Sequence, residues 1–139
     1  MYKALVDTNI FVDFMFRRMP FYENSEKIID LCEKSKVKGY ITTSTLMDLH
    51  YIFRKLSHSN NDADNAIQEI LHVFNVIEIN EKDIYDSTIT HHKDFEDSVI
   101  ESSAVRNKLG YIITRNIKDF SKDRIEILTP TQFIELLNV

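Results

Sequence analysis

The sequence predicts an α/β fold in which helices cover both faces of a parallel sheet. Short apolar runs, typical of buried strands, alternate with longer segments whose apolar residues recur every three or four positions, as in amphipathic helices. Two glycines and two prolines are few for 139 residues, which favours long helices and short connections over an all-β fold. The length is that of one domain, so we expect a single domain over residues 1–139.

The N-terminal half begins with a strand expected over residues 2–6, because the apolar run there is too short for a helix. The apolar residues that follow indicate a turn into a first helix. A second helix is predicted over residues 23–36 and a second strand over 39–42. Residues 43–56 form the next predicted helix, since their apolar side chains are three and four positions apart.

The C-terminal half continues the alternation after a polar break at residues 57–62. The expected elements are helices over 63–74, 81–90 and 94–109, strands over 76–79, 111–114 and 125–128, and a final helix from Thr129. Gly110 follows the third of these helices as a typical stop signal, and Pro130 suits the first turn of the last helix. Strands alternating with helices predict a parallel sheet.

The composition restricts the class of protein. The net charge is −5, from 17 Lys and Arg against 22 Asp and Glu, whereas proteins that hold nucleic acid by electrostatics alone are usually basic. Either nucleic acid is not the partner, or the acids gather where cations neutralise them. Cys32 is the only cysteine, and neither a secretory signal nor a membrane span is evident. We therefore expect a cytoplasmic protein without membrane association.

Acidic and polar clusters follow three of the predicted strands. They are Asp7, residues 42–48 and residues 114–119, and the helix that opens at residues 94–97 supplies further acids. If the first, second and fourth strands are neighbours, these clusters meet at the edge where open α/β sheets bind ligands. Converging carboxylates repel one another, and Mg²⁺ or Mn²⁺ resolves that conflict. Such a site can hydrolyse phosphodiesters through a metal-bound water.

Each acid also has a simpler interpretation as part of a helix cap. The spacings Thr45–Asp48, Asp94–Asp97 and Asn116–Asp119 resemble helix starts, and Asn9 is a candidate cap for the first helix. Helix starts above a parallel sheet are also where an acidic metal site would be built. The two interpretations therefore do not exclude each other.

Three segments together resemble the PIN domain. They are Leu5–Asn9, Asp94–Ser98 and Ile112–Phe120, which includes Thr-Arg-Asn and Lys-Asp-Phe, and the match spans essentially the whole chain. The resemblance implies an α/β/α sandwich with strand order 3-2-1-4-5 and an endoribonuclease that depends on Mg²⁺ or Mn²⁺. It also implies an RNA substrate and often a homodimer, and many such single-domain proteins are toxins that pair with an antitoxin.

The resemblance also assigns residues to the site. Asp7 and Asp97 match two acids of the family, and Asp48 stands where the family usually has Glu, with a reach one methylene shorter. Asn116 stands where a fourth acid is common, and Asp119 is the nearest carboxylate. The polar residues that match supporting positions are Thr8, Asn9 and Thr114. We expect Asp7, Asp48, Asp97 and Asp119 to hold the metal, with Asn116 assisting.

Two other functions can be compared with the residues of the predicted site. A non-catalytic module that binds RNA or protein is motivated by Asp48 and Asn116, which depart from the family pattern. A phosphatase or phosphoacceptor with Asp7 as nucleophile is disfavoured, because a phosphatase of the haloacid-dehalogenase type would want an acid where Asn9 stands.

Three further groups of residues each have two possible interpretations. His91 and His92 are expected at a solvated helix end rather than on a metal. The basic residues Arg17, Arg18, Arg54, Lys55, Arg115 and Lys118 are either a rim that grips phosphates or ordinary surface charge. The apolar residues Phe11, Phe14, Met15 and Phe16 are expected in the core rather than in an antitoxin groove or a dimer interface.

Overall fold

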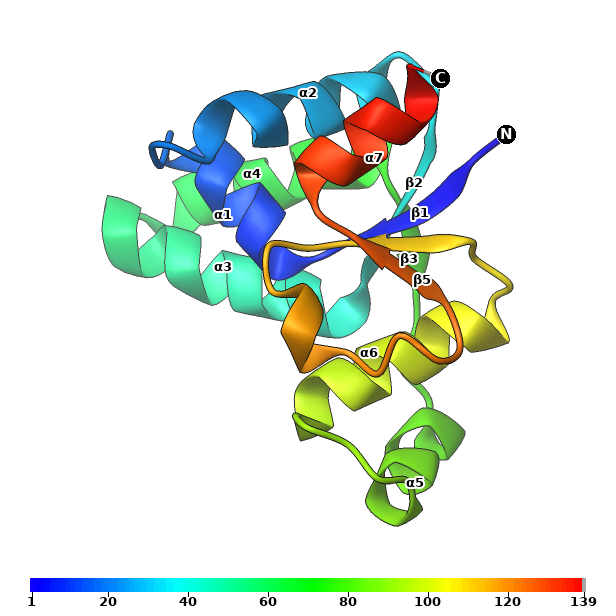
Figure 1. Ribbon diagram of the computed structural model, residues 1–139. Helices are drawn as coiled ribbons and strands as arrows, with labels where there is room; N and C mark the ends of the chain where they lie inside the picture. The colour runs from blue at the N-terminus through cyan, green and yellow to red at the C-terminus, as the bar shows by residue number, and fades with distance from the viewer. Residues whose placement is uncertain (139) are drawn as a thin grey trace.

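Helices lie on both faces of a central parallel sheet, with α1, α2 and α7 on one side and α5 and α6 on the other (Figure 1). The computed structural model describes residues 1–138, and Val139, the last residue of the expected domain, lies outside the described part. The expected α/β/α sandwich is confirmed. Among residues 1–138, no helix combines the length and the hydrophobicity needed to cross a membrane.

The elements follow the predicted alternation. In chain order they are β1 (Lys3–Val6), α1 (Thr8–Met15), α2 (Tyr22–Glu33), β2 (Lys38–Thr42), α3 (Thr43–Ser57), α4 (Asn60–Val73), β3 (Asn75–Ile77), α5 (Glu81–Ile89), α6 (Phe95–Arg106), β4 (Tyr111–Ile113), the 3₁₀ helix η1 (Ile117–Asp119), β5 (Glu126–Leu128) and α7 (Pro130–Leu137). The strand order is β3-β2-β1-β4-β5, and every pairing is parallel. The order 3-2-1-4-5 is thus confirmed.

Helix boundaries differ from the expected ones where a cap overrides the apolar pattern. α4 begins at Asn60, inside the expected polar break, because the Ser59 side chain accepts a hydrogen bond from Asp62 N at 3.1 Å. α6 ends at Arg106, and Lys108 rather than Gly110 adopts positive φ beyond it. The predicted stop at Gly110 therefore lies several residues too late.

Alternating side chains of the strands build two cores, one on each face of the sheet. Val6 and Ile113, which are register partners, belong to the core beneath α1, α2 and α7. Leu5 and Ile112, also partners, belong to the core beneath α6. This period-two alternation fixes the register, because a shift by one residue would exchange the two faces. The expected core position is confirmed for Phe11, which is 1% exposed. Phe14, Met15 and Phe16 are partly buried and pack against the same core.

Gly39 lies where β2 packs closely against Cys32 and Phe74. An added Cβ would lie 2.7 Å from Cys32 Sγ and 2.8 Å from the Phe74 ring. Phe74 is held edge-on against Phe11, with ring centroids 4.9 Å apart, so it has little room to move. We expect Gly39→Ala to lower the free energy of unfolding by about 1–3 kcal/mol, measured by denaturant titration.

Gly110→Ala is the matched control. There the added Cβ would meet Lys3 O at 3.7 Å, an ordinary contact, so the free energy of unfolding should stay the same or rise slightly. Equal losses in the two variants would contradict the described packing of β2.

Candidate active site

Asp7 is the most constrained acid of the site. It follows β1 and caps α1: its Oδ1 accepts a hydrogen bond from Thr8 N at 2.8 Å. Its Oδ2 accepts one from Thr114 Oγ1 at 2.7 Å and one from Asn9 Nδ2 at 3.3 Å. The carboxylate is only 9% exposed, and burial raises its pKa despite the hydrogen bonds from Thr114 and Thr8. Asp7, rather than the expected Asn9, is therefore the cap of the first helix.

The residues expected in supporting positions form a hydrogen-bonded group around Asp7. Asn9 Nδ2 also donates to Thr114 Oγ1 at 3.2 Å, and Asn9 Oδ1 accepts from Arg115 N at 3.3 Å. Thr114 Oγ1 further accepts from Asn116 N at 3.1 Å. These contacts join the ends of β1 and β4, which are neighbours in the sheet. They hold the Asp7 carboxylate in one orientation.

Thr8 connects this group to the third helix. Its Oγ1 lies 3.0 Å from Thr45 Oγ1, and Thr45 Oγ1 accepts from Thr42 Oγ1 at 3.1 Å. The spacing Thr45–Asp48 does not mark a helix start. α3 begins at Thr43, as its apolar pattern predicts, and Thr42 is the cap that accepts from Thr45 N. The ends of β1, β2 and β4 thus meet, as the sequence predicts for three neighbouring strands.

An open hollow of about 530 Å³ lies at this edge of the sheet. The charged and amide residues that line it are Asp7, Asn9, Arg18, Asp48, Asp94, Glu96, Asp97, Arg115 and Asn116. Acids therefore outnumber cations in its lining. The structure brings Asp7, Asp48, Asp97 and Asn116 of the predicted set to one hollow.

Asp97 lies close to several other acids, and its pKa is raised. Asp94 caps α6 by accepting from Asp97 N at 3.0 Å, which places Asp97 in the first turn and confirms the helix start expected there. Burial, followed by the negative charges of Asp7, Asp94, Asp119 and Glu96, raises the pKa of Asp97 from 3.8 to about 7. The first turn of α6 is therefore capped by Asp94 and at the same time brings Asp97 to the hollow that Asp7 lines.

Glu96 is an acid that the sequence prediction did not assign to the site. Burial raises its pKa, followed by the charge of Asp48 and by a hydrogen bond that the protonated Glu96 would make to Asp48. Asp48 itself is exposed on α3. Glu96 stands beside Asp97 in the segment that resembles the PIN domain, but the spacing of acids in a first helical turn does not indicate which ones face the sheet edge. The longer Glu96 side chain offers a carboxylate near the shorter Asp48.

Asp119, expected among the metal ligands, does not line this hollow. Asp119 is the last residue of η1 and lines an adjacent hollow. Its negative charge still raises the pKa of both Asp7 and Asp97. Asn116 makes no capping hydrogen bond with its side chain, so the helix start expected at Asn116 is only a short 3₁₀ turn.

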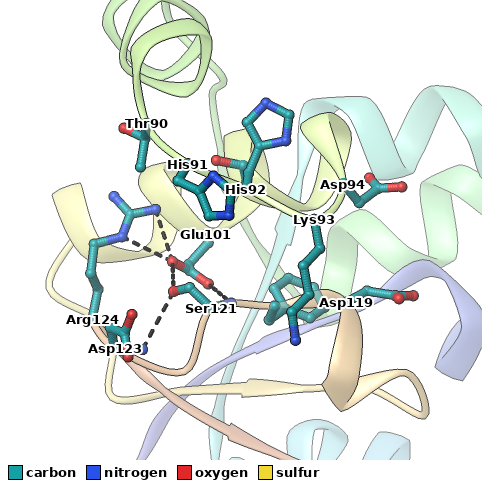
Figure 2. A pocket seen from close by; sticks show the side chains of 12 residues that line it. Thr90, His91, His92, Lys93, Asp94, Glu101, Asp119, Ser121, Asp123 and Arg124 are labelled. Carbon is teal, nitrogen blue, oxygen red and sulfur yellow. Dashed lines mark hydrogen bonds and ion pairs between the residues drawn. The ribbon is translucent and has the colours of Figure 1, made fainter.

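The adjacent hollow, of about 250 Å³, is organised around buried Glu101 (Figure 2). The Glu101 carboxylate accepts hydrogen bonds from Ser121 N at 3.1 Å, Ser121 Oγ at 2.6 Å and Arg124 Nε at 2.9 Å. These contacts attach the segment after η1 to α6, the helix that carries Asp97. His91 and His92 line the same hollow and are exposed, in agreement with the expected solvated helix end.

Two arginines of the predicted basic rim do line the acidic hollow. Arg115 is not a free cation, because its Nε and Nη2 donate to both carboxylate oxygens of buried Asp13. Arg18 is exposed. Two others, Arg54 and Lys55, lie over the Tyr51 ring on α3.

The donor set fits a hard divalent cation. Within residues 1–138, no three His, Cys, Asp or Glu side chains are arranged as a ready metal cluster. Mg²⁺ keeps several waters, however, and is often bound by only one or two carboxylates together with substrate phosphates. Asp7 and Asp97 provide two such carboxylates, each with a raised pKa. Burial is the largest cause of both raised pKa values, and a cation between the two carboxylates would supply the charge that stabilises their ionised forms.

Comparison with known proteins identifies the family. A family model described as the PIN domain matches residues 3–118. The chain belongs to the PIN domain family. No curated protein matches it.

Several solved structures of similar shape are described as toxins or toxin–antitoxin complexes. A chain of a toxin–antitoxin complex from Klebsiella pneumoniae is 26% identical, with a TM-score of 0.66 over 91% of this chain and 97% of that one. VapBC2 from Rickettsia felis, bound to a DNA fragment from the promoter, is 17% identical, with a TM-score of 0.63 over 90% and 96%. VapC20 from Mycobacterium tuberculosis, described as a sarcin–ricin loop cleaving toxin, is 10% identical, with a TM-score of 0.59 over 86% and 91%. The last two show the fold alone.

The raised pKa of Asp97 predicts how stability depends on pH in the presence of a chelator. The folded chain keeps the Asp97 proton up to about pH 7, whereas the unfolded chain loses it near 3.8. The folded state therefore binds more protons in this window, and its stability falls as pH rises. We expect Asp97→Asn to melt at a higher temperature than the parent above pH 7, with the difference vanishing near pH 4.

Asp86→Asn is the control, since Asp86 lies on α5 in an exposed pair with Lys82. It should show no such gain at high pH. A melting-temperature difference between Asp97→Asn and the parent that does not change with pH would contradict the described crowding of the acids.

Proposed function

We propose that this PIN domain is a metal-dependent endoribonuclease that hydrolyses RNA phosphodiester bonds, and that it is the toxin of a toxin–antitoxin pair. The observation that carries the proposal is the convergence of Asp7 and Asp97, from the end of β1 and the start of α6, on one hollow. Burial raises the pKa of both carboxyls, and the charge of Asp7 raises that of Asp97 further. The similarity to a chain of a toxin–antitoxin complex supports the biological role.

Asp7 and Asp97 would hold the metal, with Asp48, Glu96 and Asp119 around them. A bound Mg²⁺ or Mn²⁺ would lower the pKa of a coordinated water and offset charge on the scissile phosphate. The hydrogen bonds from Thr114 and Asn9 keep the Asp7 carboxylate oriented toward that position. These two bonds and the one from Thr8 N use three of roughly four acceptor positions of the carboxylate, so one remains for a ligand.

Asn116 and Arg18 would act on the RNA rather than on the metal. Both line the hollow and are exposed. The amide of Asn116 can donate to a phosphate oxygen, and the Arg18 guanidinium can pair with phosphate. Glu96 compensates for the short reach of Asp48 in this proposal. The proposed function also includes an antitoxin partner, a homodimer and a cytoplasmic location.

A second candidate function is a non-catalytic module that binds RNA or protein. It is favoured by the neutral Asn116 at a position where the family often has an acid, and by Asp48, which is exposed and shorter than the usual Glu. A parent chain that binds RNA but cleaves none with either Mg²⁺ or Mn²⁺ would support this module.

Asp7→Asn tests the proposed hydrolysis. The change keeps the size of the side chain but removes a charge beside the metal position, so cleavage of RNA with Mn²⁺ should fall by at least about 100-fold. The measurement is the rate at which the parent and the variant cleave total RNA, analysed by gel electrophoresis.

Asp86→Asn serves again as the control and should cleave at the parent's rate. Equal cleavage by Asp7→Asn and the parent would remove Asp7 from the mechanism and, with it, the proposed function.

A further inference from the structure

We propose that a second hollow, beside Phe21, binds one nucleobase of the RNA next to the bond that the acidic site cuts; this inference rests on the proposed function. The hollow lies between the starts of α2 and α7 and has a volume of about 460 Å³, within the range of small-ligand sites. Phe21, Asn24, Ser25, Arg115 and Thr131 are among the residues that line it.

The two hollows are neighbours, because Arg115 lines both. Asp13 accepts from Nε and Nη2 of this guanidinium, and a guanidinium has five N–H donors, so others remain for a phosphate. An RNA strand whose scissile phosphate lies at Asp7 and Asp97 would therefore pass Arg115 before it reaches Phe21.

The chemistry of the lining fits a base. None of the described residues that line this hollow is acidic, in contrast to the hollow beside Glu101, where Asp94, Asp119 and Asp123 also contribute. The lining beside Glu101 also holds Lys93 and Arg124, but its four acids outnumber these two cations, so that side is the less favourable one for a strand of phosphates. Such a strand would meet Arg115 on the Phe21 side.

Phe21 offers a stacking surface. Its side chain is 40% exposed, and Arg115 Cζ lies 3.9 Å from its ring centroid. Unpaired RNA bases stack on aromatic rings and on guanidinium planes, and here the two are held together. The Asp13 carboxylate fixes the guanidinium, so this surface is formed before RNA binds.

Two polar side chains in the lining, Asn24 and Ser25, can bind the edge of a base. Asn24 Nδ2 donates to Thr131 Oγ1 at 3.0 Å, and an amide keeps a second N–H and an acceptor oxygen. Ser25 is fully buried, and its Oγ has no hydrogen-bond partner among the residues that the structure describes. A buried hydroxyl without a partner is costly, and a small movement that brings a base edge to it would satisfy it.

The test uses the Asp7→Asn chain, which would not cleave, and fluorescent RNA oligonucleotides of two to six nucleotides. Anisotropy should show a step in affinity at the length that reaches Phe21. Adding Phe21→Ala should remove that step, a loss of about fivefold or more, because stacking on an aromatic ring is worth roughly 1–3 kcal/mol per base. Phe21→Tyr keeps a ring and should keep the step.

Tyr85→Ala is the matched control: Tyr85 is an exposed aromatic residue on α5, and its loss should leave every affinity unchanged. If Phe21→Ala fails to fold, Asn24→Ala is measured in its place, with the same loss expected. If the Asp7→Asn chain binds no oligonucleotide, the same series is measured as KM for cleavage by the parent.

Two results would overturn the inference. One is an unchanged step in Phe21→Ala; the other is a loss of affinity that is equal at every length, which would indicate a weaker grip on phosphates instead of a lost base contact. Either result leaves the proposed function intact as long as the parent cleaves RNA. A parent that cleaves none refutes the proposed function itself.

Discussion

The hydrogen bond from Thr114 to Asp7 is the contact on which the site depends. It joins the ends of β1 and β4 and, with the bonds from Asn9 and Thr8, fixes a nearly buried carboxylate at the edge of the sheet. The sheet order makes this contact available, because β1 lies between β2 and β4. The other acids that line the hollow gather around this carboxylate: Asp48, Asp94, Glu96 and Asp97.

Crowding of carboxylates is the physical cost of this arrangement. Asp97 and Glu96 approach from α6 and Asp48 from α3. Burial is the largest cause of the raised pKa values of Asp7, Glu96 and Asp97, and the charges of neighbouring acids raise them further. Arg115, one of the two cations in the lining, is paired with Asp13. A site that keeps its acids unneutralised is expected where a ligand, here a divalent cation, supplies the missing charge.

The sequence predicted the sheet and its helices because both follow from local periodicity, and it predicted the meeting of Asp7 with the Thr114 segment because strand ends meet in a parallel sheet. It missed the start of α4 and the cap of α3, where a single hydroxyl decides the boundary. It could not identify Glu96, since several acids share one helical turn. The Asp13–Arg115 pair joins residues 102 positions apart and leaves no local signal.

The most direct test of this account is a crystal structure with Mn²⁺, using anomalous scattering to locate the ion. The account predicts a peak within ligand distance of a carboxylate oxygen of both Asp7 and Asp97, or of waters that they bind. A Mn²⁺ peak elsewhere on the protein, with none between Asp7 and Asp97 at millimolar Mn²⁺, would contradict it.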